Sequence, residues 1–100
     1  MLKSIIDNLS TCEKPLMRVI FRNNTTRIVA IGLKKGMKLV DHRLPVITKM
    51  ILIKGQVIID SKIEIVTLTE YQQYEIPAKV IHQVKVEEDA LALLFLDFSQ

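Results

Sequence analysis

The chain has a single cysteine, few aromatic residues and no long apolar run, and these shortages exclude several classes of protein. Cys12 has no second cysteine for a disulfide and lacks the paired spacing of a zinc site, so we interpret it as an ordinary thiol. No apolar stretch approaches the roughly 20 residues that cross a bilayer, and we expect no membrane association. Asp7 and Asn8 interrupt the apolar residues near the N-terminus, which is unlike a secretory signal and predicts a cytoplasmic protein.

Charge of one sign is also scarce, because the net charge is only +3 and lysines and arginines are scattered among acidic residues. The short basic cluster Lys34, Lys35 and Lys38 could attract phosphate. No aromatic residue lies among these lysines to stack on bases, so we interpret the cluster as a solvated turn and expect no nucleic-acid partner. With 100 residues, 49% of them hydrophobic, the chain is predicted to form one soluble globular domain over residues 1–100.

Short segments of alternating polarity, separated by turn residues, run through most of the chain. We expect turns at Asn23–Asn24, Lys54–Gly55 and Glu87–Asp89, a polar connector at Thr69–Glu75, and a bulge or bend at Gly32. No helical segment separates the strands, which argues against a parallel α/β sheet and favours an all-β jelly-roll barrel over residues 15–98. The predicted strands are 16–21, 27–33, 36–42, 46–53, 56–59, 62–68, 80–86 and 90–98.

The first 13 residues carry a helical pattern, which predicts a short amphipathic N-terminal helix over residues 1–13. Such a helix is too short to be stable alone, so its apolar face must lie on the barrel or on a partner subunit. Strand 46–53 is apolar on both faces, and Ile51 and Ile53 on its second face need a cover. We therefore predict a homodimer. The apolar residues of the helix are Leu2, Ile5, Ile6 and Leu9.

Each of the two histidines falls in an otherwise mostly apolar row of a predicted strand. Because side chains alternate along a strand, His82 shares a face with Val80, Val84 and Val86. By the same rule His42 shares a face with the alternate residues of its own strand, Lys38, Val40 and Leu44. Polar groups that converge in an apolar cavity are the usual outline of a small-molecule site.

Five positions around His42 have the spacing of the first cupin motif: a glycine, five residues, a His-x-His pair, a glutamate three or four residues later, then six residues and a glycine. Gly36 and His42 match its beginning, and Gly55 matches its last glycine. Leu44 stands in place of the second histidine, and Thr48 stands in place of the glutamate.

The second cupin motif, a glycine, five residues, proline, one residue, glycine, two residues, histidine, three residues and asparagine, is matched in part. Pro77 and His82 fit it. Tyr71 and Lys79 occupy the two glycine places, and Val86 occupies the asparagine place. Over residues 27 to 97 the chain thus resembles the cupin family, which implies a double-stranded β-helix with a ligand pocket inside the barrel.

The resemblance also implies a metal site built from three histidines and one glutamate, of which this chain has two members, His42 and His82. Leu44 offers no lone pair, and the neutral hydroxyl of Thr48 does not balance the charge of a dication. Asp41 follows the alternation to the opposite face from His42. We therefore expect no cofactor, with a divalent transition metal held by His42 and His82 as the alternative.

Three functions compete on this basis. The first is a binding or regulatory module without a catalytic metal, which takes a small apolar or neutral ligand. The second is a metal-dependent oxygenase or isomerase with a reduced ligand set. The third is a partner-binding protein with a vestigial pocket, in which the histidines are only hydrogen-bonded core residues. A metal-free acid or base role for His82, with Tyr71 or Tyr74, is a further alternative. The predicted ligand-binding residues are His42, His82, Leu44, Thr48, Met50 and Val84.

Overall fold

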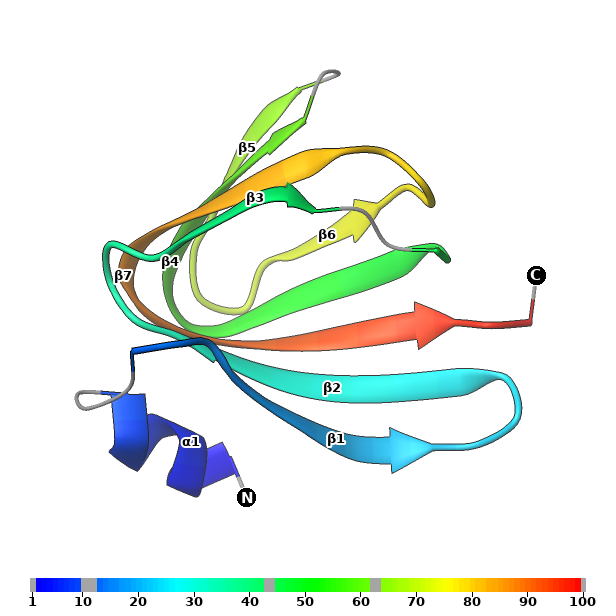
Figure 1. Cartoon of the computed structure of the whole chain (residues 1–100), viewed down its shortest axis with the longest axis horizontal. Helices are drawn as coiled ribbons and strands as arrows, with labels where there is room; N and C mark the ends of the chain where they lie inside the picture. The colour runs from blue at the N-terminus through cyan, green and yellow to red at the C-terminus, as the bar shows by residue number, and fades with distance from the viewer. Residues whose placement is uncertain (1, 10–12, 43–44, 62–63, 100) are drawn as a thin grey trace.

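The computed structural model describes residues 2–9, 13–42, 45–61 and 64–99, with the backbone alone for residues 40–42 (Figure 1). Within these residues a short helix precedes seven strands, and every strand pairing is antiparallel. In chain order the elements are α1 (Leu2–Asn8), β1 (Leu16–Arg22), β2 (Thr26–Leu33), β3 (Lys38–His42), β4 (Thr48–Ser61), β5 (Ile65–Leu68), β6 (Gln73–Ile76) and β7 (His82–Asp97).

Two long bent strands, β4 and β7, connect two layers of the barrel (Figure 1). The first half of β4 pairs with β6 and with the second half of β7, and β2 and β1 extend this layer on the other side. The second half of β4 pairs with β5 and with the first half of β7, which also pairs with β3. This is the predicted all-β jelly roll with a short N-terminal helix.

The turns expected at Lys54–Gly55 and Glu87–Asp89 are instead bends inside continuous strands, and both predictions are wrong. The pairing of β4 with β7 shifts register in three steps between Leu52 and Val57 without ending. Gly55 has a φ of 93°, and a Cβ atom there would lie 2.8 Å from the Cα of Ala90. A bulge that brings the two backbones this close bends the paired strands together, as barrel corners require.

The polar connector predicted at Thr69–Glu75 contains most of a strand, because β6 pairs with β4 from Thr48 to Ile51. Its side chains alternate between exposed and less exposed positions, and Ile76 at its end is buried. Polar residues suit the outward positions of such a strand, so composition alone is a poor guide to its ends.

The main hydrophobic core lies between the two layers, where the alternating residues of each strand point inward. Its members form one contiguous cluster of buried aliphatic side chains. They include Val29, Ile31 and Leu33 of β2, Leu52 and Ile59 of β4, and Val84 and Leu94 of β7.

Helix α1 covers part of the outer face of the first layer, and its Ile5 is 2% exposed. Ile53 packs against the small cluster that Ile5 forms with Ala30 and Leu91. The chain itself therefore covers Ile53, and the expected second subunit is not needed there. A Cβ atom on Gly32 would overlap Cγ2 of Ile5. The register of β2 is regular at Gly32, so the bulge expected there is wrong and the glycine instead admits the helix.

The helix ends at Asn8, earlier than the predicted residue 13, and Cys12 lies outside the described residues. In the described part of the chain, no helix has the length and apolarity needed to cross a membrane.

Candidate functional site

An apolar cavity of about 360 Å³ lies on the inward side of the barrel. Its wall consists mainly of aliphatic side chains from β1, β2, β3, β4, β6 and β7, so both layers contribute to it. The polar side chains among its described lining residues are those of Arg18, Arg27 and His82. A cavity of this size, apolar with a few polar groups, falls in the range of about 300 to 1,000 Å³ that is usual for small-molecule sites.

The structure brings three of the predicted site residues together around this cavity, namely Met50, His82 and Val84. Thr48 is fully buried on the same face of β4 but does not line the cavity. Its hydroxyl donates a hydrogen bond to the backbone oxygen of Val46 over 3.1 Å. Ligand binding by these residues stays a prediction.

His42 and Leu44 are placed only in part. Leu44 lies outside the described residues, and of His42 only the backbone is described. That backbone lies opposite His82 in the pairing of β3 with β7. The two histidines, 40 positions apart in the sequence, are therefore cross-strand neighbours.

The predicted inward row of Lys38, Val40, His42 and Leu44 is wrong at Lys38, whose side chain is exposed. Leu39 takes the inward position, lines the cavity and lies opposite Val84. The register shifts between Leu39 and His42, and an extra residue in one strand shifts the alternation of side chains. A strict period of two therefore fails across this strand.

His82 is 3% exposed and its ring is held by the backbone two residues earlier. Nδ1 lies 3.2 Å from the backbone oxygen of Val80, and because a carbonyl oxygen only accepts, Nδ1 carries the hydrogen and donates it. In the neutral ring the lone pair then resides on Nε2. Nε2 is therefore the acceptor atom of the ring.

Neither tyrosine is placed to act with His82, because neither lines the cavity. Tyr71 is 80% exposed. The hydroxyl of Tyr74 donates a 2.7 Å hydrogen bond to Oε1 of Glu64. This hydrogen bond, with burial and the charge of Glu64, raises the pKa of Tyr74 to about 12. The acid or base pairing considered from the sequence is not formed.

The described side chains do not fit the metal that the cupin resemblance implies. Within the described residues, no group of three or more His, Cys, Asp or Glu side chains is placed to hold a metal ion. The cavity wall supplies one described imidazole, that of His82, and no carboxylate. One imidazole and the neutral hydroxyl of Thr48 fall short of the three or more protein ligands that usually hold a transition metal.

The backbone supports the motif assignment at all four glycine places. Gly36 and Gly55, from the first motif, have φ angles of 89° and 93°. Tyr71 and Lys79 occupy the glycine places of the second motif, and they are the non-glycine residues with positive φ in the described chain, at 69° and 63°. Left-handed backbone is uncommon for such residues. The chain thus adopts the conformation that favours glycine even where it has another residue.

Arg27 is one of the two arginines of the cavity, with Arg18, that sequence reasoning missed. It belongs to the inward row of β2 with Val29, Ile31 and Leu33, and the same alternation could have found it. Its Nε atom is buried and has no hydrogen-bond partner in the described part of the chain. Its guanidinium carbon lies 5.1 Å from the centre of the Phe98 ring.

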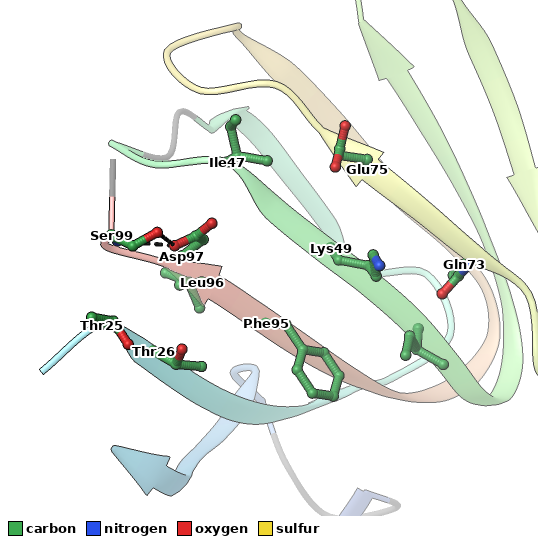
Figure 2. Close-up of a pocket in the computed structure, with 11 residues that line it drawn as sticks. Thr25, Thr26, Ile47, Lys49, Gln73, Glu75, Phe95, Leu96, Asp97 and Ser99 are labelled. Atoms are coloured by element: carbon green, nitrogen blue, oxygen red, sulfur yellow. Dashed lines mark hydrogen bonds between the residues drawn. The ribbon is translucent and has the colours of Figure 1, made fainter. Parts of the chain in front are cut away.

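A second, larger groove of about 510 Å³ lies on the outward face of the first layer, and Figure 2 shows its side chains on β4, β6 and β7. It includes Lys49, Glu75 and Asp97, charges of both signs, and the Asp97 carboxylate accepts a hydrogen bond from the backbone of Ser99. Its described lining comes from neighbouring strands of one layer and the residues that flank them, whereas both layers enclose the interior cavity. The interior cavity is therefore the better candidate for a small-molecule site.

No protein-family model matches the sequence, and no curated protein matches it. Solved structures do match the fold. A conserved protein of unknown function from Streptococcus pyogenes matches with a TM-score of 0.77 at 22% identity, over 88% of this chain and 77% of that chain. A cupin superfamily protein from Desulfitobacterium hafniense matches with a TM-score of 0.79 at 14% identity, over 87% and 80% of the two chains.

An RmlC-like cupin family protein with a double-stranded β-helix fold, from Methanocaldococcus jannaschii, matches with a TM-score of 0.74 at 13% identity, over 87% of this chain and 83% of that chain. These matches agree with the two bent strands and the two layers. The chain therefore has the double-stranded β-helix fold of cupin proteins.

Proposed function

We propose that the protein is a small-molecule-binding module that works without a catalytic metal. The interior cavity is the observation that carries this proposal, because an apolar wall with three polar side chains suits recognition better than charge-balanced metal chemistry. A cytoplasmic location, in which a lone thiol such as Cys12 stays reduced, belongs to the same proposal.

The cavity limits the size of the ligand. At roughly 30 Å³ for a water-sized group, its 360 Å³ holds about twelve such groups. A ligand of about ten non-hydrogen atoms with an aliphatic body would fill it. Such a body would be stabilised by the apolar surface that it removes from water, at about 25 cal/mol per Å².

A neutral probe of this size tests the proposal. Octanamide should shift the backbone amide resonances of β2 and of the first half of β7, measured by NMR titration of the labelled protein. Val84→Phe places a ring in the cavity and should abolish these shifts. Ile51→Phe, which adds a ring to the outward groove, is the matched control and should leave them unchanged. Shifts confined to the outward groove, or none at millimolar octanamide, would refute the proposal.

A metal-dependent enzyme is the second candidate, and the position of His42 opposite His82 favours it. Elemental analysis of protein purified without a histidine tag separates the two candidates. We expect a metal content well below one per chain. A stoichiometric transition metal would overturn the metal-free proposal.

We also propose a homodimer, in which the edge strand β1 pairs with the same strand of a second copy. β1 ends the first layer and exposes large apolar residues, with Met17 54% and Phe21 46% exposed. An antiparallel pair centred on Val19 places Met17 opposite Phe21. Arg18 and Arg22 then lie opposite apolar residues, so no like charges face each other directly.

Light scattering at micromolar concentration tests the dimer. Ile20→Lys adds a charge to β1 outside the cavity and should yield monomers. Ile65→Lys adds the same charge to β5, at an exposed position away from β1, and should leave the dimer intact. A monomer mass for the unmodified protein would contradict the proposal.

A further inference from the structure

The guanidinium of Arg27 is the polar group of the cavity whose bonding is incomplete. Nε of Arg27 is shielded from solvent, and it has no hydrogen-bond partner in the described part of the chain. Buried donors of this kind are nearly always paired, because an unmet donor keeps the cost of its lost hydration. The cavity that Arg27 lines is where an acceptor could be supplied.

Phe98 holds the guanidinium without satisfying it. The Arg27 guanidinium carbon lies 5.1 Å from the ring centre, within the range of a cation–π contact. The ring is positioned by its own backbone, because the N–H of Phe98 donates a 2.7 Å hydrogen bond to the oxygen of Thr25. A ring face attracts the positive charge but does not accept the in-plane hydrogen of Nε.

The surroundings of Arg27 are positive. Residues 16–33 contain three arginines and no acidic residue. Arg22 lies directly opposite Arg27 across β1 and β2, and Arg18 lines the cavity. None of the described lining residues of the cavity is acidic. Arg22 and Arg27 repel each other across the strand pair, and an anion bound in the cavity beside Arg27 would lower this repulsion.

We propose that the ligand is an amphipathic monocarboxylate whose head group binds Arg27 and whose aliphatic body fills the cavity. This inference rests on the proposed small-molecule function and replaces the neutral ligand expected from the sequence. Two carboxylate oxygens match the planar fork of a guanidinium. Because Nε is shielded in the present conformation, the guanidinium must turn from Phe98 towards the cavity to donate to the ligand from that atom.

Two probes of the same shape separate the head group from the body. Octanoate and octanamide differ only in that one end is anionic, and calorimetry gives the affinity of each. We expect octanoate to bind the unmodified protein about tenfold to a hundredfold more tightly, as for a charged hydrogen bond. Arg27→Met should remove this preference while octanamide still binds. Lys85→Met removes the same charge at an exposed position outside the cavity lining and should retain the preference.

The relative affinities of the two probes distinguish the carboxylate assignment from the binding function itself. Equal affinity for both probes overturns the carboxylate assignment and leaves the binding function standing, whereas failure of both probes to bind rejects the two together. An equal loss of preference in Lys85→Met and Arg27→Met shows an effect of net charge and overturns the contact with Arg27. If Arg27→Met does not fold, the Arg27 Nε–H resonance of the unmodified protein decides. It must shift with octanoate and not with octanamide.

Discussion

Gly32→Ala adds a single methyl group at the contact between α1 and the outer face of the barrel. The added Cβ would overlap Cγ2 of Ile5 and would lie 3.1 Å from Cδ2 of Leu9. Cγ2 of Ile5 is attached directly to its Cβ, and the β-branched side chain has little rotamer freedom in a helix, so it cannot turn away. The helix itself must therefore move.

The expected loss of stability follows from what α1 and Leu9, the residue after it, bury. Ile5 and Leu9 are each 2% exposed, and full burial of such a side chain stabilises a protein by about 1.5 to 3 kcal/mol. Overpacking by one methyl group usually costs about 1 to 3 kcal/mol, because the neighbours shift rather than separate. We expect Gly32→Ala to lower the free energy of unfolding within that range. The loss of stability cannot exceed that of releasing α1 from the barrel, because a helix this short is not stable once its apolar face is exposed.

Urea unfolding of a double-mutant cycle measures the contact. Ile5→Ala alone should cost about 2 to 5 kcal/mol and removes the atom that Gly32→Ala would strike. In that background Gly32→Ala should cost less than about 0.5 kcal/mol, so the two changes are not additive. Gly36→Ala is the control. Its φ of 89° makes alanine costly, but no atom lies within 4 Å, so its cost should be the same with or without Ile5. Additive costs for Gly32→Ala and Ile5→Ala would refute the proposed packing of α1.

Three further predictions address the backbone, a hydrogen bond and the metal. Lys79→Gly should raise the free energy of unfolding by up to about 1 kcal/mol, because glycine relieves left-handed strain, and an unchanged urea midpoint would contradict this. The folded state raises the pKa of Tyr74 from 10.0 to about 12, so the stabilisation is complete below pH 10 and is lost as pH rises towards 12. Thermal unfolding of the unmodified protein and of Tyr74→Phe over that pH interval measures this loss. The unmodified protein should lose at most about 1 kcal/mol more than the variant, since the pair with Glu64 is solvent-exposed. The same dependence of stability on pH in both proteins would argue against the hydrogen bond. Leu44→His combined with Thr48→Glu should bind a transition metal and should be less stable without it, because position 48 is fully buried. Failure to gain metal in elemental analysis would contradict the motif assignment.

The sequence predicted the barrel well where alternation alone decides the structure. The strands found as β1 and β2 lie within one residue of the predicted ranges, because both are rich in β-branched and other apolar residues and are separated by the turn residues Asn23 and Asn24. The prediction failed at Gly55, where a glycine is compatible with both a turn and a bulge. The choice depends on Ala90, which lies against Gly55 and is 35 positions away in the sequence. Local patterns do not contain that contact.

The candidate site was predicted in part for a related reason. Met50, His82 and Val84 follow strict alternation in β4 and β7, whose pairing with each other has no register shift at those positions, and all three line the cavity. Lys38 was assigned to the wrong face because the shift between β3 and β7 changes the alternation before His42. Arg27 had the right alternation to be found. A charged residue at the end of an apolar row is usually taken as the solvent end of its strand.

Tyr71 and Lys79 keep the backbone conformation of the motif without its glycines. Both adopt left-handed backbone at places that the motif gives to glycine, at a cost of about 1 kcal/mol or more each. At Tyr71 the surrounding pairing enforces it, because its N–H donates a 2.7 Å hydrogen bond to the oxygen of Leu52 and the N–H of Leu52 donates to the oxygen of Gln72. Long-range backbone pairing thus sets the conformation of Tyr71 although its side chain does not favour it. The pairing itself joins backbone atoms and does not specify the side chains that line the cavity. For this chain the backbone therefore supports the fold, while the function has to be argued from the cavity and from Arg27 within it.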